Sequence, residues 1–445
     1  MRHQPASPQL GMAVLAMVMI LLFGISLIVL YLNRSIIFEQ RISANQMRST
    51  TAQEMAEAGI EWATGMFNSV EFIGSNCETL AGASLTFRKQ YVTVSPTPSV
   101  ASHVMPGCKV NPATGVSLCH CPAVPASGTT IADLGSASLP GFSVQFSPVA
   151  GDAEAVRLVS TGCTEQTGTC GPGTRGASDA SASVSVVLKL MPGLRAVPAA
   201  PLTCGLSCSV GGSFDIVNQD VATGGILVNA GSTVSATASH LTTIPGQPVS
   251  SAIVDNDQSL LNLASNDPTC SNSSMFSAFF GSTIDKYMAS PLTKTITCST
   301  ANVCGQLINT AYNAGWRAFY FPQSLEINNS APFTQLGTPT DGVSLVSPGQ
   351  IDINGNISLY GMLFSNNSNV NYLGTGTANV YGAMVTCGGF NSNGNGTVSY
   401  LSSALSSTRT SSARMVRMPG SWTDRCALGL PLPTVANAVP TINCN

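Results

Sequence analysis

Cysteine is the residue type in this sequence with the clearest potential for chemistry. The chain holds 14 cysteines in 445 residues, and all of them follow a long apolar run near the N-terminus. An even number of cysteines confined to the part beyond such a run predicts disulfides formed in an oxidising compartment. The cysteines are Cys77, Cys108, Cys119, Cys121, Cys163, Cys170, Cys204, Cys208, Cys270, Cys298, Cys304, Cys387, Cys426 and Cys444.

Short spacings indicate which cysteines pair locally, and the rest of the connectivity stays open. Zinc is the alternative, because Cys119-His120-Cys121 and Cys204-x-x-x-Cys208 are close groups. No second ligand pair lies at a matching distance, so we expect disulfides rather than a metal. The expected local pairs are Cys163/Cys170, Cys204/Cys208, Cys298/Cys304 and Cys426/Cys444.

Two carboxylates in a polar loop could bind calcium through their oxygens. Asp255 and Asp257 stand in the sequence Val-Asp-Asn-Asp-Gln, and oxygen donors are what Ca²⁺ prefers. An isolated Asp-x-Asp in a Ser- and Asn-rich loop is more typical of a turn. We therefore expect no metal and no cofactor, and whether this pair binds calcium stays open.

Catalytic constellations are absent from the sequence. Between residues 350 and 401 the only acidic residue is Asp352, and there is no Lys, Arg or His. The chain also lacks a nucleophile elbow, a phosphate loop and an HExxH motif. The sequence predicts a protein that is not an enzyme. Its net charge of −3 without a Lys/Arg cluster also argues against nucleic acid as a partner.

The element that organises the chain is the apolar run at residues 12–32. Every residue in it is uncharged, and it is long enough to span the ~30 Å core of a bilayer as a helix. A short leader, residues 1–11, precedes it and ends in Gly11. Because no small-x-small cleavage site follows, the run is expected to be retained as a helix at residues 12–33.

A helical continuation is predicted beyond the membrane, over residues 34–75. No proline occurs from residue 35 to 70, and apolar residues recur at helical spacing. A helix from residue 12 to about 70 would be ~90 Å long. The alternative is a plain signal anchor followed by a stalk.

Two further parts follow the helix. Residues 76–191 are expected to form a disulfide-rich β head, and a Pro/Ala-rich linker at 192–201 separates it from a second domain at 202–410. An insertion with helices is expected at about 259–315, and an extended tail at 411–445. The predicted strands of the head are 85–94, 142–146, 156–160 and 182–190.

An internal repeat marks the second domain. Residues 355–365 align with residues 376–386 at an offset of 21, and residues 396–401 begin the same way 20 residues later. Segment 349–355 has the same form. A period near 20 with glycine at the corners is typical of a β-solenoid; an antiparallel sandwich with evenly spaced hairpins is the alternative. Ile357, Leu359, Ala378, Val380 and Val398 would face inward, with Tyr360 and Tyr381 stacked outside.

The N-terminal seventy residues resemble a known family. A leader ending in Gly before an apolar helix is similar to the signal of type IV pilins and pseudopilins. Residues 38–48 (FEQRISANQMR) and 52–63 (AQEMAEAGIEWA) resemble the PilX family of pilus-assembly minor pilins. One departure concerns the Glu that major pilins carry five residues into the mature chain, because Ala16 stands at that position here.

The resemblance implies a mechanism and a set of partners. A prepilin peptidase would cut between Gly11 and Met12, and the helix would then move from membrane lipid into a fibre core among other pilins and the inner-membrane assembly machinery. Ala13, Ala16 and Gly24 are small enough to allow close helix contact. With Ala16, the chain would lack the Glu pairing of major subunits, which favours a place in a priming or tip complex; a plain lipid-facing Ala16 is the alternative.

The sequence therefore predicts an α+β protein with a long N-terminal pilin-like helix, a small β-rich head and a C-terminal right-handed parallel β-solenoid (β-helix). Its expected function is that of an accessory minor subunit in type IV pilus biogenesis, and adhesion is a further expectation with its surface ligand open. It would sit in the bacterial inner membrane with a cytoplasmic N-terminus, and be periplasmic or extracellular in the pilus. The alternatives are a minor pseudopilin of type II secretion, a membrane-anchored adhesin and, less favoured, a β-helix polysaccharide enzyme.

Overall fold

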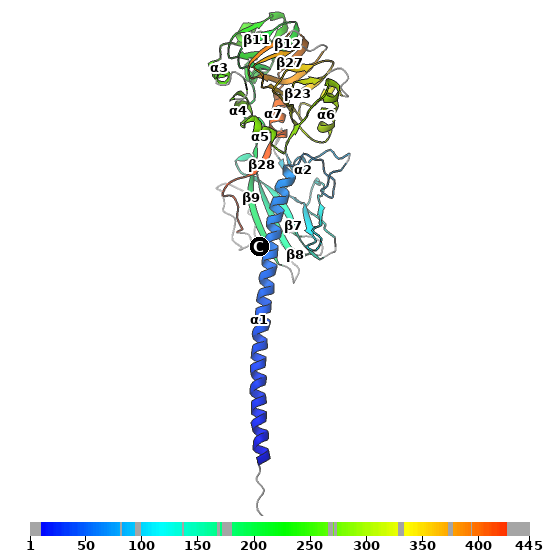
Figure 1. Cartoon of the computed structure of the whole chain (residues 1–445), viewed down its shortest axis with the longest axis vertical. Coiled ribbons are helices and arrows are strands. Elements are labelled where there is room, and N and C mark those ends of the chain that lie inside the picture. The colour runs from blue at the N-terminus through cyan, green and yellow to red at the C-terminus, as the bar shows by residue number, and fades with distance from the viewer. Residues whose placement is uncertain are drawn as a thin grey trace, which may run out of the picture.

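The molecule is a long helix that carries two stacked bodies at one end (Figure 1). We call the body around the end of the helix the head (residues 68–191 and 413–424) and the body beyond it the distal domain (residues 202–411). The computed structural model describes residues 10–80, 82–93, 99–135, 138–166, 170, 180–265, 270, 274–327, 333–372, 377–392 and 394–424. The α+β class and the long N-terminal helix agree with the sequence prediction.

Helix α1, Leu10–Phe67, is a single unbroken helix of 58 residues. The predicted continuation to residue 75 is wrong at its end, and Asn68 explains why. Its side-chain amide donates to the backbone oxygen of Thr64 at 3.0 Å and to that of Met415 at 2.9 Å, and its amide oxygen accepts the Met415 N–H at 2.8 Å. Asn68 thus satisfies a free carbonyl in the last turn of the helix. The same side chain joins the end of the helix to the backbone of Met415.

The head is built on an antiparallel sheet of six strands in the order β28-β9-β8-β7-β4-β5. The strands predicted at 142–146, 156–160 and 182–190 fall inside β7, β8 and β9. Two short pairs, β1 with β2 and β3 with β6, lie beside the sheet. The bounds are β1 Val92–Thr93, β2 Ser99–Val100, β3 Val104–Met105, β4 Gly107–Val110, β5 Ser117–His120, β6 Thr130–Ile131, β7 Leu139–Val149, β8 Asp152–Gln166, β9 Ser181–Met191 and β28 Arg414–Arg417.

One predicted strand of the head is wrong. Most of segment 85–94 is helix α2, Phe87–Tyr91, and only Val92–Thr93 is extended. The Thr86 hydroxyl accepts the Lys89 N–H at 3.2 Å and caps the helix. Phe87 and Tyr91 are four residues apart and both fully buried, which is the spacing of one helix face.

The second half of α1 packs closely against the face of the head sheet. Gly162 in β8 makes this approach possible, because a Cβ there would overlap Ala52 O and Ala56 N of the helix. The core between them includes aromatic rings that meet edge to face, such as Phe67 with Phe146 at 5.2 Å. The buried side chains of the helix are Ala52, Ala56, Ile60, Ala63 and Phe67.

All strand pairs recorded in the described part of the distal domain are parallel. The twelve-stranded sheet contains the path β15-β12-β27-β25-β23-β21-β18-β17, and smaller sheets have the orders β14-β11-β26-β24 and β19-β22. The bounds are β10 Leu202–Cys204, β11 Cys208–Val210, β12 Ser213–Val217, β13 Val228–Ala230, β14 Val234–Ala236, β15 Leu241–Thr242, β16 Ile253–Val254, β17 Thr293–Thr295, β18 Ala318–Tyr320, β19 Leu325–Ile327, β20 Gln335–Leu336, β21 Val343–Ser347, β22 Ile351–Ile353, β23 Ser358–Ser365, β24 Asn369–Tyr372, β25 Asn379–Thr386, β26 Gly389–Ser392 and β27 Asn395–Ser399.

The sequence repeat sets part of this register. Leu359 in β23 lies beside Val380 in β25, which is the predicted offset of 21. The next offset is wrong, because Val380 lies beside Val398, 18 residues on. The chain takes eight residues from Tyr372 to Val380 but only six from Ser392, the partner of Tyr372, to Val398. Segment 349–355 does not join this column either, since its strand β22 pairs with β19. The five residues predicted to face inward are all buried.

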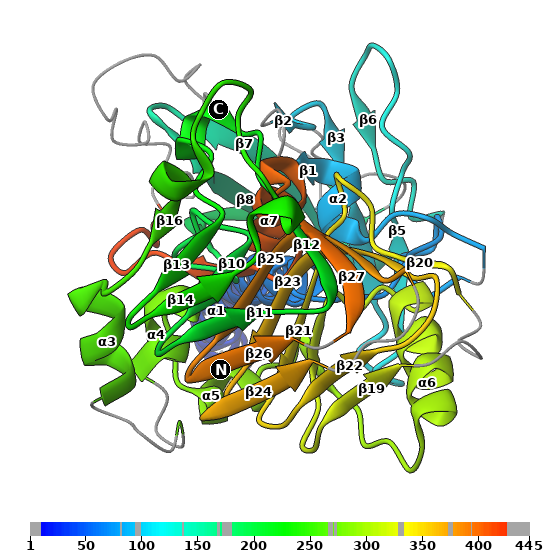
Figure 2. The ribbon, with the colours of Figure 1, turned by 90° about the horizontal axis from the view of Figure 1, so that it is seen from above.

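The distal domain stacks its strands out of chain order. Strand β10 pairs with β25, and β12 pairs with β27, although some 180 residues separate them. From β16 the chain crosses, through the helices of the expected insertion, to the other end of the sheet at β17. Figure 2 shows the strands side by side, with α3 and α6 at opposite sides. The helices are α3 Gln258–Ser265, α4 Ser274–Phe280, α5 Ile284–Met288, α6 Ala301–Asn313 and α7 Ser402–Ser411, with 3₁₀ turns η1 Val221–Thr223, η2 Ala238–His240 and η3 Val249–Ala252.

The distal domain is inserted between two neighbouring strands of the head. The chain leaves the head after β9 and returns as β28, and Met191 lies beside Arg414 in the antiparallel pair. The two connections touch, because the Gly193 N–H donates to Arg409 O at 2.9 Å. Of the tail predicted at 411–445, Ser411 is the last residue of helix α7 and Arg414–Arg417 is a strand of the head sheet. The rest of α7 occupies the end of the region predicted as β.

Candidate assembly interface

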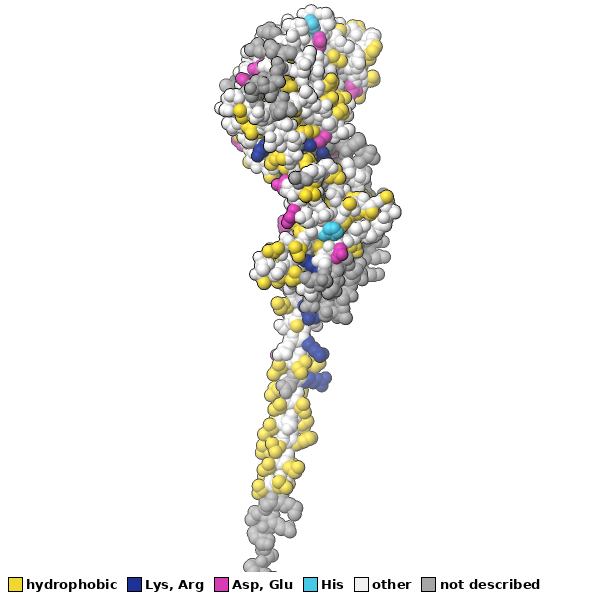
Figure 3. Space-filling view, turned by 90° about the vertical axis from the view of Figure 1, so that its right-hand side faces the viewer, with side chains coloured by type: hydrophobic (Ala, Val, Ile, Leu, Met, Phe, Trp, Pro, Cys, Tyr) yellow, Lys and Arg dark blue, Asp and Glu magenta, His cyan; other side chains and the backbone are white. Residues whose placement is uncertain are grey.

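The described side chains in the first half of α1 are free of the head and the distal domain. Its large apolar side chains from Val14 to Leu32 are all at least 49% exposed. Among the described residues, the helix contains a window with mean hydropathy 2.8 that is 0% buried, so its length and composition suit a membrane span. Figure 3 shows the apolar side chains along this part of the helix. An exposed apolar surface of this size suits contact with lipid or with other apolar helices.

The small residues predicted to permit close helix contact lie on this free part. Ala16 is exposed, and a Cβ on Gly24 would meet nothing within 4 Å. Gly11, Met12 and Ala13 belong to the first turns of α1, and their side chains lie outside the described residues. Their roles in cleavage and packing stay predictions.

An ion pair, hydrogen bonds and aromatic contacts hold the upper half of α1 on the head. Glu61 on the exposed side of the helix pairs with Arg417 of β28 at 2.7 Å. Asn68 clamps the helix end to the same strand. Trp62 packs against Phe87 and Phe142, with ring centroids 5.3 and 5.5 Å apart. Strand β28 thus contacts helix α1 through both Glu61 and Asn68.

A cluster of charges joins the head to the distal domain. Lys89 of α2 pairs with Asp341 at 2.9 Å, and Arg317 of the distal domain donates to the same carboxylate at 2.8 and 3.0 Å. Burial alone would raise the pKa of Asp341, but hydrogen bonds and charge from Arg317, with Lys89 behind them, hold that pKa below its usual range. The carboxylate is therefore ionised at neutral pH and bridges the two bodies.

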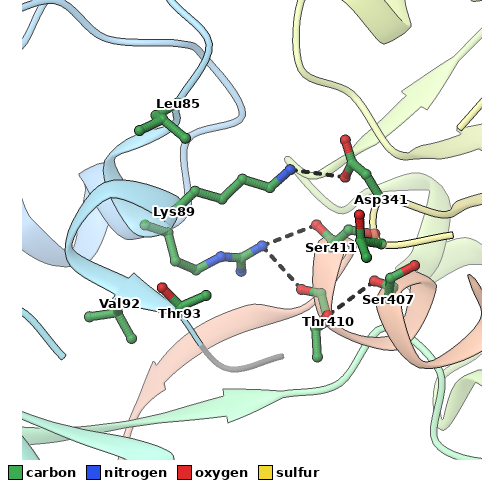
Figure 4. A pocket seen from close by; sticks show the side chains of 10 residues that line it. Leu85, Lys89, Val92, Thr93, Asp341, Ser407, Thr410 and Ser411 are labelled. Atoms are coloured by element: carbon green, nitrogen blue, oxygen red, sulfur yellow. Dashed lines mark hydrogen bonds and ion pairs between the residues drawn. The ribbon is translucent and has the colours of Figure 1, made fainter. Parts of the chain in front are cut away.

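Arg88 makes a second bridge at the same junction. Its guanidinium donates to the backbone oxygens of Ala413, Thr410 and Ser411 at the end of α7, where a cation suits the helix dipole. Burial lowers the pKa of Arg88 to about 10, so it remains charged at neutral pH. Arg88, Lys89 and Asp341 line a cavity of about 300 Å³ together with Thr410 and Ser411 (Figure 4). The charged groups are bonded to each other and to backbone oxygens across the junction. We therefore interpret this cavity as a structural joint between the head and the distal domain.

Sequence reasoning missed this joint because its members lie far apart in the chain. Arg88 and Lys89 sit in a segment that was predicted as a strand, whereas Asp341 follows a Gly-Thr-Pro-Thr turn. The usable signal is scarcity: only 9% of residues are charged. In such a composition, adjacent cations beside buried aromatics are candidates for an internal bridge.

The candidate calcium pair forms a turn. The Asp257 carboxylate accepts hydrogen bonds from the Ser259 N–H and hydroxyl at the start of α3. Partial burial would raise the pKa of Asp257, but these bonds outweigh burial and lower it. Asp255 is exposed and makes no recorded contact with Asp257. The described residues contain no group of three or more His, Cys, Asp or Glu side chains that could hold a metal.

The described cysteines form six disulfides. Three are the local pairs expected from spacing, Cys163–Cys170, Cys204–Cys208 and Cys298–Cys304, while Cys426 and Cys444 lie outside the described residues. The Cys-His-Cys group is divided between two bonds, because Cys119 joins Cys108 and Cys121 joins Cys77. The long-range bond Cys270–Cys387 fixes the crossing segment of the distal domain to its sheet.

On the outside of the distal domain, the two tyrosines of the repeat stack as predicted. Tyr360 and Tyr381 lie on neighbouring strands with ring centroids 4.8 Å apart and planes 17° apart. One rung of an asparagine ladder also forms, from Asn391 Nδ2 to Asn371 Oδ1 at 3.4 Å. These contacts stabilise the stacking of strands, and they do not by themselves identify a ligand.

Comparison with known proteins bears on the helix. Residues 11–61 match the family described as PilX N-terminal, so the chain carries a PilX-type N-terminal segment, as the resemblance predicted. Among solved structures, the competence-associated pilin ComZ from Thermus thermophilus is similar over 84% of this chain and 97% of its own, with 11% identity and a TM-score of 0.23. Comparison with curated proteins finds no match.

Proposed function

We propose that this protein is a pilin-like accessory subunit of the type IV pilus class, acting in a priming or tip complex. The observation that carries the proposal is the PilX-type segment at residues 11–61 on a helix whose first half is apolar and free. Such a helix can reside in a bilayer before assembly and among other subunit helices afterwards. The proposal includes no catalytic activity.

The place of the distal domain supports an accessory role. It lies at the end of the head away from the free helix, along the long axis of the molecule (Figure 1). A subunit that carries a second body in this position has room for it at the growing or exposed end of a fibre. Exposed polar strands there would also suit contact with a surface ligand, which gives the adhesive role its basis.

The finer fold that we propose for the distal domain is a parallel β-solenoid. Its support is the run of parallel pairs that places Leu359 beside Val380 and Val380 beside Val398 in one buried column. The tyrosine pair repeats the register of Leu359 and Val380 on the outside, and the asparagine rung joins the neighbouring parallel pair β24 and β26. A solenoid is a stiff support for a surface held beyond the head.

The processing and location of the chain complete the proposal. A prepilin peptidase cleaves between Gly11 and Met12, the N-terminus faces the cytoplasm, and the head and distal domain face the periplasm and then the exterior. The partners are other pilins, the inner-membrane assembly machinery and membrane lipid. Ala16 in place of an early Glu removes one contact to a neighbour, so Ala16→Glu is expected to alter incorporation.

N-terminal mass spectrometry of the chain, taken separately from sheared surface fibres and from membranes, tests the proposal. A chain that begins at Met12 in fibres is the expected result. Met12 in membranes alone would replace the pilus role with that of a pseudopilin. An intact leader would overturn the proposal in favour of a membrane-anchored adhesin.

A further inference from the structure

Three arginines form a stripe on the free part of α1. Arg34, Arg41 and Arg48 recur every seven residues and are all exposed. With 3.6 residues per turn, they lie within about 40° of one another around the helix axis. Figure 3 shows the basic side chains of this part projecting to one side. We call residues 34–51 of α1 the neck.

The carboxylates of the helix occupy the opposite side. Glu39, Glu54 and Glu57 are exposed and lie within about 60° of one another, centred about 180° from the arginines. The neck and the turn above it are therefore basic on one face and acidic on the other.

The helix does not satisfy these charges itself. Arg34 lies five residues before Glu39 and Arg48 lies six before Glu54, while Arg41 lies two residues after Glu39. Pairs along a helix form at a spacing of three or four residues. The ion pairs of the described residues include none of these three arginines. Arg34 instead stacks over the Phe38 ring at 5.6 Å.

The same two spacings define a register between parallel helices. If a neighbouring helix is shifted toward its N-terminal end by five to six residues, Glu39 comes level with Arg34 and Glu54 with Arg48. The shift equals about 8 Å at 1.5 Å per residue. Arg41 then faces Gln46, which can accept its hydrogen bonds.

We propose that the arginine face of the neck binds the acidic face of a second copy of this chain, parallel to it and shifted by about 8 Å. The inference rests on the proposed function, and it adds the partner and the register of that assembly. Because the two faces of one helix differ, the contact is head-to-tail, and the pair leaves one acidic and one basic face open for other subunits.

Anionic lipid is the other partner that an arginine stripe could meet. Arg34 lies two residues beyond the apolar run, within reach of headgroups. Arg48 lies fourteen residues further, about 21 Å along an upright helix. A partner helix that runs along α1 can contact all three arginines, whereas a layer of lipid headgroups can contact only Arg34.

Thiol cross-linking between two tagged forms of the full chain, made together in cells, tests the register. One form carries Arg41→Cys and the other Gln46→Cys, and a short bis-maleimide joins free thiols without reshuffling the native disulfides. We expect a 41–46 cross-link between the two tags. The matched control pairs Arg41→Cys with Ile36→Cys, which has the same separation and the opposite shift. The proposal is overturned if only the 41–36 control pair cross-links. It is also overturned if both pairs cross-link to the same extent, or if neither pair does.

Charge reversal tests the complementarity. Arg48→Glu in both forms is expected to lower the yield of the 41–46 cross-link about fivefold, the scale of one surface ion pair turned to repulsion. Adding Glu54→Arg is expected to restore the yield to within about twofold. An unchanged yield in Arg48→Glu, or no recovery in the double variant, contradicts the pairing.

The cross-linking result can be told apart from the result of the N-terminal mass spectrometry that tests the proposed function. A chain beginning at Met12 in fibres without the 41–46 cross-link leaves the pilus role standing and overturns the second copy as partner. Dependence of the cross-link on anionic lipid, with no change in Arg48→Glu, would assign the stripe to the membrane. A cross-link between copies in a chain that keeps its leader would contradict the pilus role alone.

Discussion

Gly162→Ala is the substitution that most directly probes how the head holds the helix. The added carbon would lie 2.9 Å from the Met55 carbonyl carbon and closer still to Ala52 O and Ala56 N. All three are backbone atoms of α1, so no side-chain rotation can relieve the overlap. The helix as a whole must move away by about 1 Å or more to reach an ordinary contact distance.

The size of the effect follows from the packing that this shift would open. Overpacking a closely fitted core typically costs 1–3 kcal/mol, and we expect the free energy of unfolding of the head to fall by about 3 kcal/mol, because only backbone opposes the new atom. The matched control is Gly65→Ala in α1, whose added carbon meets nothing within 4 Å. There we expect a gain of about 0.5–1 kcal/mol from helix propensity.

Fluorescence of Trp62 gives the assay, because its ring packs between helix and sheet against Phe87 and Phe142. The full chain in detergent micelles, with Trp316→Phe and Trp422→Phe, is unfolded in urea while this signal is followed. The expected order of midpoints is Gly65→Ala highest, the parent next, and Gly162→Ala lowest. A Gly162→Ala midpoint equal to that of the parent would refute close backbone approach as the basis of the helix–sheet contact.

Two further predictions concern the joint between the bodies. Asp341→Ala leaves Arg317, only 8% exposed, without its carboxylate, so thermal unfolding of the full chain should show a loss of about 3 kcal/mol; Asp152→Ala, which breaks a surface pair, should cost under about 1 kcal/mol. The pKa of Asp341 is lowered on folding. Its contribution to the free energy of unfolding is therefore complete above about pH 4 and is lost as the pH falls further through the folded pKa. The same thermal melts at pH 3 and pH 6 check this dependence. Replacing residues 194–411 with a short glycine turn should leave the three disulfides of the head correctly paired in peptide mapping, since the two cut ends lie side by side.

The parts of the fold that the sequence predicted are those with a local cause. The apolar run and its proline-free continuation predict α1, and period-2 alternation predicts β7, β8 and β9. Cysteines a few residues apart predict their own bonds, since a short loop leaves few alternatives. The 21-residue offset predicts the pairing of β23 with β25, because both strands repeat the same pattern of buried residues.

What the sequence did not predict depends on contacts between distant segments. Helix α2 has a pattern that suits a strand over its short length, and only the core that Phe87 and Tyr91 share decides in favour of a helix. The helix end at Phe67 depends on Asn68 reaching Met415, more than 340 residues away. The bond Cys270–Cys387 likewise depends on the chain crossing the distal domain, for which no local pattern exists.

The order of strands in the distal domain explains both why it is hard to predict and why it suits its position. Its first strands, β10 to β12, lie against its last, β25 to β27, so both connections to the head leave from the middle of the stack. Because the connections are adjacent, the distal domain is held to the head by two neighbouring segments of the chain and by the bridges that Asp341 and Arg88 form. A load on the distal domain therefore passes through β9 and β28 into the sheet on which α1 packs, and β28 is the strand that Asn68 and Glu61 join to that helix.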